Sequence, residues 1–487
     1  MCTGRLAPRL RIPPTLRWSA VGILLIAVTA PLAVIDPILP LFAIGGLIVV
    51  GLAAFTPKLF ALIATATILF SVPLQSILGP LGRNADELVI VLAFVAFCTR
   101  RFALERRLVM FPGFLWFLGF AGFGVLSAVE LHVPSAIFVE GLFLAIKGLI
   151  FAFALAQLDW TVKDLKLLVR AGIVMIVFLA FTAVGNLAAP GPWAMAFTRR
   201  PPVDYMAGIP ALSGPFQHPA AFGRMCAVLA IAVFAYRYAV RSSVGNTILM
   251  IVTTLLAVLT FRVKSIVGLI GALGLIGLRF SKPITIFLVL CLGPLVVVFI
   301  VPPLLQFVGS DIDTYILSTS ARSTLTAGSV DVANGYFPFG AGFGRYGSFT
   351  ASVEYSPEYI SRGFDHIYGL GRGDDGAFLN DTQWPAIIGE TGWLGSASFV
   401  VGLVFVFLSL FRRTSEDEAP LVRWLRICGA GWLTLILIES IAAPVLSSAP
   451  AYPFTFAAAG MIASIRYRST HPSNESKLRD ARTDVVL

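Results

Sequence analysis

Long apolar stretches recur along almost the whole chain, and they constrain its fold more than any other feature. A membrane-spanning helix needs roughly 20 consecutive apolar residues, and we count about fourteen stretches near that length. They cover residues 18–35, 38–56, 59–79, 86–98, 109–129, 134–157, 166–188, 219–238, 245–261, 265–280, 284–302, 385–411, 424–443 and 451–465. A hydrophobic fraction of 57% with 13% charged residues leaves too little polar surface for a soluble domain. The sequence therefore predicts an all-α polytopic membrane protein with about 12–14 transmembrane helices.

Basic residues indicate on which side of the membrane the connections lie. Arginines without any acidic residue precede the first apolar stretch, and the positive-inside rule then places the N-terminus in the cytoplasm. Alternation puts the other basic connections on the same side: Arg100, Arg101, Arg106, Arg107, Arg237, Arg241, Arg279, Lys282, Arg412, Arg413 and Arg466. Both termini are thus predicted to be cytoplasmic, with the first stretch retained as an anchor rather than cleaved.

The net charge of +10 follows from this topology, because the basic residues are spread over short connections instead of forming one stripe. A nucleic-acid partner is not expected. The 5 cysteines lie in or beside apolar stretches or in the N-terminal tail, without zinc-ligand spacing or a disulfide framework.

One long polar segment interrupts the apolar pattern. Residues 304–383 hold 9 acidic side chains, 4 arginines and one histidine, and alternation places them on the outer face. The chain thus divides into N-terminal membrane helices (1–303, about eleven spans), this outer loop (304–383), C-terminal membrane helices (384–466, about three spans) and a disordered cytoplasmic tail (467–487). Chemistry in water is expected to be concentrated in the outer loop, which carries the predicted active site.

Cations that break the positive-inside pattern need a separate reason. Arg262 and Lys264 occupy a turn so short that both must stay near the outer membrane boundary, as an anion site or as side chains that reach lipid headgroups. Upstream, Pro219 suits the first turn of a helix, with His218 before it and Arg224 about one turn further in. Such a helix N-terminus favours phosphate, whereas the alternative role of His218 is a local cap.

Two acidic residues stand out near the end of the outer loop. Asp381 lies at the mouth of a span whose first residues, Trp384 and Pro385, suit an interfacial helix start, and a carboxylate held there can act as a general base. The alternatives for Asp381 are an N-cap or a solvated acid. Glu390 lies inside the span and is expected to find an arginine or backbone partner.

Glycine-rich turns account for two further patterns in the loop. Residues 337–346 alternate glycines but lack the strand and crossover helix of a nucleotide site, so we expect a tight turn packed against the membrane helices, with Arg345 projecting from it. Asp374 and Asp375 are interpreted as a solvated turn or, alternatively, as part of a divalent-cation site.

The order of these pieces resembles the bacterial O-antigen ligase and Wzy-type polysaccharide polymerase superfamily over roughly residues 210–400. The matching pieces are Gly214-Pro215-Phe216-Gln217-His218-Pro219-Ala220, the turn 260–265, Ala321-Arg322-Ser323, residues 338–344, and residues 381–395 with Glu390-Thr391-Gly392-Trp393-Leu394-Gly395. The resemblance implies a GT-C-like membrane glycosyltransferase of the bacterial inner membrane that takes a glycan from undecaprenyl diphosphate at the periplasmic face. It also implies that the enzyme needs no metal and no cofactor.

The resemblance also implies roles for individual residues. Asp381 would be the catalytic base, at a position where the family typically has histidine, and Thr382 stands where the family has asparagine. That departure favours a polymerase that makes exopolysaccharide or O-antigen. Membrane lipid, a chain-length regulator and export machinery would be its other partners. The remaining site residues implied are, for the diphosphate, Arg224, Arg262, Lys264, Arg322, Arg345 and His218, and in support Trp384 and Glu390.

Two alternatives stay open. A ligase would share the lipid-linked donor and pass the glycan to lipid A core or another acceptor. A transporter of polysaccharide or lipid-linked glycan could use the intramembrane ionisable residues Glu140, Lys147 and Glu439, and it would predict internal repeats and broken spans. The sequence shows no internal repeat, and a transporter needs no large outer loop.

Overall fold

The computed structural model describes residues 39–79, 82, 84–197, 205–206, 208–280, 321–372, 378–412 and 418–471. The expected spans 18–35 and 284–302 lie outside these residues, as do Asp374 and Asp375. The chain forms two compact units, Met1–Ala61 and Leu62–Leu487. The first unit contains α2 (Leu39–Phe55), and α3 begins in it and continues into the second unit. The second unit holds every candidate site residue.

The described part of the chain is almost entirely helical, as predicted. Its further elements are α3 (Pro57–Leu69), α4 (Ser71–Leu78), α6 (Ala85–Glu105), α7 (Phe114–Glu130), α8 (Ser135–Ala156), α9 (Val162–Ala188), α10 (Pro190–Phe197), α11 (Pro219–Ala239), α12 (Val244–Val258), α13 (Val263–Phe280), α15 (Ala321–Gly335), α16 (Phe349–Glu354), α17 (Pro357–Ile360), η2 (Phe364–His366), α18 (Trp384–Phe411), α19 (Pro420–Glu439) and α20 (Tyr452–Thr470). The exception is a two-stranded antiparallel ladder of β1 (Tyr205–Met206) and β2 (Ile209–Pro210).

Several of these helices can cross a bilayer. Among the described residues, 5 helices are long and apolar enough, namely α8, α9, α11, α18 and α19, and the bent pair α3 and α4 would make 6. An apolar helix of this length satisfies its backbone hydrogen bonds internally, as hydrocarbon requires. The protein is therefore a multi-pass membrane protein.

The expected span 59–79 is not one continuous helix. It is divided into α3 and α4, which meet at an angle of 74°. Pro73 explains the break, because in a continuous helix its ring would clash with the carbonyl four residues earlier, at Leu69. α3 ends at Leu69, and Pro73 instead occupies the first turn of α4. Apolar composition alone did not reveal this bend.

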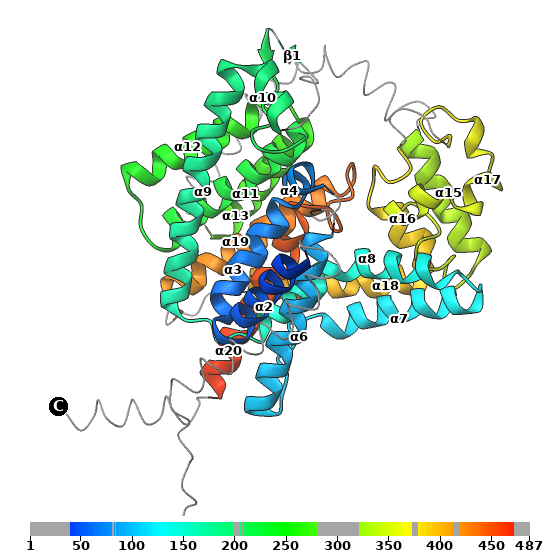
Figure 1. Ribbon diagram of the computed structural model, residues 1–487, viewed down its shortest axis with the longest axis horizontal. Helices are drawn as coiled ribbons and strands as arrows, with labels where there is room; N and C mark the ends of the chain where they lie inside the picture. Colours follow the sequence, from blue (N-terminus) through cyan, green and yellow to red (C-terminus); the bar gives the residue numbers. More distant parts are fainter. Residues whose placement is uncertain are drawn as a thin grey trace, which may run out of the picture. The chain divides into compact units, whose positions relative to one another are not determined.

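The described residues between Ala321 and Leu379 form a small folded unit, which we call the outer segment after its predicted side of the membrane. Its buried core comprises Leu325, Val332, Ala341, Tyr346, Ala351, Tyr355, Tyr359, Phe364, Leu370 and Leu379. Figure 1 shows α15, α16 and α17 grouped beside α7, α8 and α18, and α15 packs directly on α18. Burying these aromatic side chains supplies the stabilisation that fixes the segment on the membrane helices.

The glycine turn attaches this unit to the membrane helices, as predicted. Ala341 N–H donates to the Gly389 carbonyl at 2.8 Å, and Gly342 N–H donates to the Glu390 carbonyl at 2.9 Å. Gly392 breaks α18 with a φ of 61°, a conformation that favours glycine. A Cβ on Gly392 would also overlap the backbone of Gly340. Only glycine therefore allows the turn and α18 to approach this closely.

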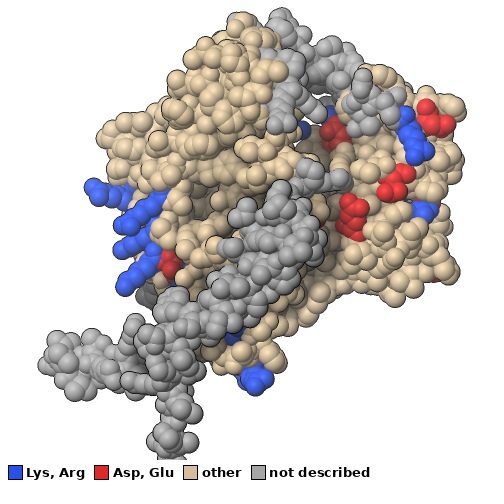
Figure 2. Space-filling view, in the orientation of Figure 1, with Lys and Arg blue, Asp and Glu red and all other residues tan. Residues whose placement is uncertain are grey.

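Charged side chains are distributed unevenly over one face of the molecule. Figure 2 shows most of the acidic side chains of that face gathered where Figure 1 draws α15 to α17, together with some Lys or Arg side chains. Other Lys and Arg side chains project from the opposite side and from the lower end.

Candidate functional site

An ion pair joins the outer segment to the start of α18. Arg322, in the first turn of α15, donates from Nε to Oδ2 of Asp381 at 2.6 Å, and a second guanidinium nitrogen donates to the same oxygen. The two side chains are 30% and 27% exposed. Because both remain partly open, the pair can be reached by a substrate, unlike a pair sealed in the core.

The segment that carries Asp381 is held firmly on the connection between α19 and α20. Gln383 N–H donates to the Ser440 carbonyl at 3.2 Å, and its side-chain Oε1 accepts from Leu446 N–H at 3.0 Å. Trp384 Nε1 donates to Ser440 Oγ at 3.0 Å. α18 begins at Trp384, as expected from the sequence. These bonds fix the position of the Asp381 backbone, which a reacting group requires.

Two further cations lie beside the Arg322–Asp381 pair. Lys264, at the start of α13, donates to the Ala442 carbonyl at 3.1 Å. Its charge interacts with those of Arg224, Arg322, Asp381 and Glu439. Arg224 donates from Nε to a carboxylate oxygen of Glu439, and both side chains are buried. The structure therefore brings together Arg224, Lys264, Arg322 and Asp381, which the sequence had predicted to form one site.

These charges leave the site net positive. We call Arg224, Lys264, Arg322, Asp381 and Glu439 the cationic cluster. Arg262 lies two residues before Lys264 and is half-buried. Three cations against two carboxylates give 3 − 2 = +1 for the cluster. In a partly buried site this charge attracts an anion more strongly than it would in water.

His218 and Arg345 occupy other surroundings. His218 is the N-cap of α11, and its Nδ1 accepts from Ala220 N–H at 3.1 Å, the local role considered as the alternative. Arg345 lies 3.5 Å from Glu358, which also accepts from Arg362 at 2.6 Å. The structure thus places Arg345 in a network inside the outer segment rather than in the cationic cluster.

Glu390 finds backbone and hydroxyl partners, as its position in a span required. Its Oε1 accepts from Ser348 Oγ at 2.6 Å and from Tyr346 N–H at 3.3 Å. Both partners belong to the outer segment, so this buried carboxylate joins α18 to the chain after the glycine turn. Its role is therefore support of the site's architecture.

Two buried tyrosines of the outer segment are not acid–base candidates. Tyr346 donates its hydroxyl to the Leu325 carbonyl at 2.8 Å, and Tyr359 accepts from Gly347 N–H at 2.8 Å. Burial raises the pKa of Tyr359 well above its ordinary value and raises that of Tyr346 as well. Both phenols therefore stay protonated, and Asp381 is the better-placed proton acceptor.

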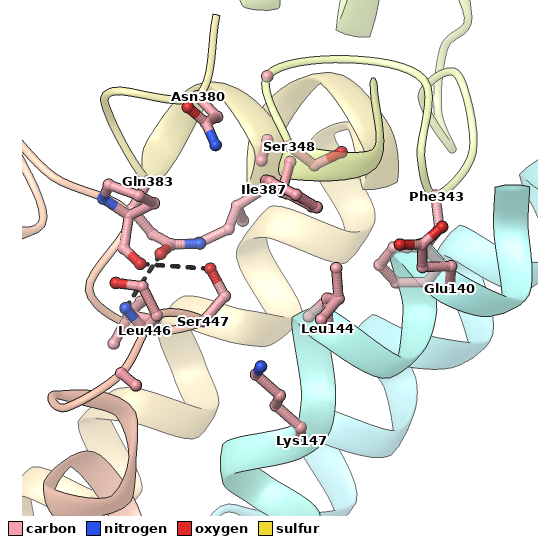
Figure 3. Close-up of a pocket in the computed structure, with 18 of the residues that line it drawn as sticks. Glu140, Leu144, Lys147, Phe343, Ser348, Asn380, Gln383, Ile387, Leu446 and Ser447 are labelled. Atoms are coloured by element: carbon pink, nitrogen blue, oxygen red, sulfur yellow. Dashed lines mark hydrogen bonds between the residues drawn. The ribbon is translucent and has the colours of Figure 1, made fainter. Parts of the chain in front are cut away.

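A cavity of about 550 Å³ borders the same segment. Asn380, Thr382 and Gln383, the neighbours of Asp381, line it together with residues of α4, α6, α8, α18 and the connection after α19. Figure 3 shows Glu140 and Lys147 of α8 beside this space, with Asn380 and Gln383 on another wall. Among the residues predicted for the site, Glu390 is the one that lines the cavity.

The sequence had not predicted the acidic residues that α6 contributes to the cavity. Asp86 and Glu87 open α6, and Asp86 accepts from Lys147 Nζ at 3.1 Å and from the Tyr452 hydroxyl at 3.0 Å. The sequence signal that could have indicated them was a pair of carboxylates at the start of an apolar stretch, where an unpaired charge is costly. That pattern does not show which distant residue, such as Tyr452, hydrogen-bonds to Asp86.

Comparisons with known proteins do not assign this site: no family model matches the sequence, and no curated protein matches it. The functional argument therefore depends on the residues and their geometry.

Proposed function

We propose that this protein is a membrane glycosyltransferase that polymerises oligosaccharide repeat units linked to undecaprenyl diphosphate, for exopolysaccharide or O-antigen. In this proposal the chain crosses the bacterial inner membrane about 12–14 times, with both termini cytoplasmic and the segment 304–383 periplasmic. The observation that supports it best is the cationic cluster, in which the Arg322–Asp381 pair lies beside Lys264 and Arg224.

The charge of the cluster suits the proposed donor. A diphosphate between a lipid and a sugar carries about two negative charges, one on each phosphoryl group. The cluster has an excess of positive charge, which attracts such a group. Guanidinium groups bind phosphate oxygens in a forked geometry, and an ammonium adds a point charge. Arg224 is already paired with Glu439. In this account it acts through its electrostatic field and helps to orient the donor, while Lys264 and Arg322 contact the phosphates.

The chemistry follows from the same groups. An acceptor hydroxyl gives its proton to Asp381 as its oxygen attacks the anomeric carbon of the donor. The bond from that carbon to the diphosphate oxygen breaks, and the electron pair leaves with the lipid diphosphate. Cations around the diphosphate stabilise the developing charge, so no acid has to protonate the leaving group.

The Arg322–Asp381 pair couples donor binding to this step. When the diphosphate arrives, Arg322 can exchange the carboxylate for a phosphate oxygen, and Asp381 is then released to accept a proton. Both side chains are partly exposed, which leaves room for the exchange. The base is thus made available only when a donor is bound.

Replacing Arg322 with alanine should weaken the binding of undecaprenyl diphosphate to the purified protein in nanodiscs. Removal of one charge-assisted hydrogen bond to phosphate predicts a loss of about tenfold or more. Arg345→Ala is the matched control, because Arg345 pairs with Glu358 away from the cluster. That variant should bind within about twofold of the wild type. Equal losses in the two variants, or none in Arg322→Ala, would contradict the assignment of the cluster.

The proposed orientation can be checked by cysteine labelling in intact cells. Tyr368, in the outer segment, is 85% exposed, and Ser469, near the end of α20, is exposed as well. A membrane-impermeant maleimide should label Tyr368→Cys in intact cells with a permeabilised outer membrane, and Ser469→Cys only after lysis. The unsubstituted protein controls for its own cysteines. Labelling of the two positions in the reverse order would overturn the topology.

A further inference from the structure

The cavity beside Asp381 carries a charge opposite to that of the cationic cluster. Asp86, Glu87 and Glu140 line it with carboxylates, whereas Lys147 is the single Lys or Arg of the lining among the described residues. Lys147 donates to Asp86 at 3.1 Å and lies 4.9 Å from the centre of the Tyr452 ring. Its charge is therefore offset within the protein, and the cavity remains electronegative toward a ligand.

The rest of the lining is neutral and suited to hydrogen bonds. Amides come from Gln75, Asn84, Asn380 and Gln383, hydroxyls come from Ser447 and Ser448, and Phe120, Phe343 and Phe399 add apolar surface. Amide and carboxylate oxygens accept hydrogen bonds from the hydroxyl groups of a ligand, while amide nitrogens donate. A volume of about 550 Å³ lies within the range of pockets that bind small organic ligands.

One polar group of the lining is left unsatisfied by the described part of the chain. Thr382 is 4% exposed and lines the cavity. Its hydroxyl oxygen is buried and has no hydrogen-bond partner among the described residues. A buried polar atom left unsatisfied is costly, so a rotation of the Thr382 side chain toward a ligand hydroxyl in the cavity would be favourable.

The position of the cavity relative to Asp381 decides which ligand it could take. Asn380 and Thr382 flank Asp381 in the chain and line the cavity, whereas Asp381 itself pairs with Arg322 of the cationic cluster. One short segment thus borders an electropositive and an electronegative site, with the proposed base between them. A diphosphate would be attracted to the first site and repelled from the second.

We propose that this cavity is the acceptor site, and that it selects a glycan end without carboxylate, phosphate or sulfate groups, so that the accepting sugar is neutral or carries an amine. This proposal rests on the proposed function and adds the substrate class to it. The acceptor sugar lies against Glu140 and Asn380, with its reacting hydroxyl directed to Asp381. Anionic sugars are excluded by the carboxylates, as the diphosphate is.

The test uses two probes on the purified protein in nanodiscs. The first is undecaprenyl diphosphate, and the second is the free repeat oligosaccharide, released by mild acid from the lipid-linked glycan of cells that lack this protein. Glu140→Gln and Asn380→Ala should each weaken binding of the oligosaccharide about fivefold or more. The affinity of both variants for undecaprenyl diphosphate should stay within about twofold of the wild type. Lys264→Ala should show the reverse pattern. Glu140 is exposed, so its replacement is not expected to unfold the protein.

The outcomes separate this inference from the proposed function. If neither probe binds the wild type, the proposed function fails. If undecaprenyl diphosphate binds but Glu140→Gln and Asn380→Ala leave oligosaccharide binding unchanged, the acceptor site is wrong while the donor site stands. An elution profile in size-exclusion chromatography identical to that of the wild type shows that Glu140→Gln is correctly folded. Asn380→Ala tests the same site with an independent variant. An accepting sugar found by mass spectrometry to carry a carboxylate would overturn the charge selection.

Discussion

Replacing Asp381 with asparagine should lower the rate of polymer formation by about 10²- to 10⁴-fold, the usual contribution of a general base. Asparagine keeps the shape of the side chain but cannot take the proton of the acceptor hydroxyl. Affinity for undecaprenyl diphosphate should stay equal or increase, because Arg322 no longer has a carboxylate competing for its guanidinium. Measuring turnover and donor affinity on the same purified variant tests the loss of rate and the retained affinity together.

Asp331→Asn is the matched control for this experiment. Asp331 is an exposed carboxylate of α15, the helix that also provides Arg322. Its replacement changes the net charge by the same amount and should leave turnover within about twofold. Should Asp381→Asn keep more than about a tenth of the wild-type rate, Asp381 is not the base.

Breaking the buried ion pair of the site should have the largest effect on stability. Glu439 is 0% exposed and holds Arg224, which is 5% exposed. Glu439→Ala leaves a buried guanidinium without this carboxylate, at a cost of about 3–5 kcal/mol. The purified variant should unfold at a clearly lower temperature than the wild type, as measured by fluorescence during heating. An unchanged unfolding temperature would show that the pair does not stabilise this part of the protein.

A double variant separates the structural role of the pair from its role in binding. Arg224→Met combined with Glu439→Leu replaces two buried charges by apolar groups, which can restore much of the lost stability. Binding of undecaprenyl diphosphate should stay within about twofold of the wild type, because the variant removes one cation and one carboxylate and leaves the net charge of the cluster unchanged. If the double variant regains stability but loses affinity, Arg224 itself contacts the diphosphate.

The sequence was sufficient to predict much of the architecture and part of the cluster. Apolar length predicted the helices, because hydrocarbon allows few other structures. Arg262 and Lys264 stood out as exceptions to the positive-inside pattern, and Lys264 lies near Arg322 and Asp381, which come from other elements. Charges near the ends of spans are confined to a narrow layer, so a shared face already brings them close together.

Where the structure differs from the sequence-based predictions, the causes are local contacts. His218 caps α11 through Ala220, which is the local role that the sequence had left open as the alternative to phosphate binding. Arg345 reaches Glu358 because the outer segment folds around its own core. The sequence did not reveal this core, because its members come from several short helices and turns between Leu325 and Leu379. Pro73 ended α3 within a stretch whose hydropathy is uninterrupted.

The cavity could not be predicted from the sequence at all. Its walls come from α4, α6, α8, the chain after the glycine turn, the start of α18 and the connection after α19. Glu140 and Lys147 share a helix, yet Lys147 pairs with Asp86, sixty-one residues before it in the sequence. No periodicity in one helix indicates which distant side chain will share its pocket.

The most direct test of the central claim is the profile of lipid-linked glycans in cells that lack this protein. The account predicts that single lipid-linked repeats accumulate, long polymer disappears, and the wild-type gene restores it. Long polymer that remains on the lipid carrier but fails to reach its final acceptor would contradict a polymerase and indicate a ligase. A profile identical to that of the parent cells would contradict glycosyl transfer altogether.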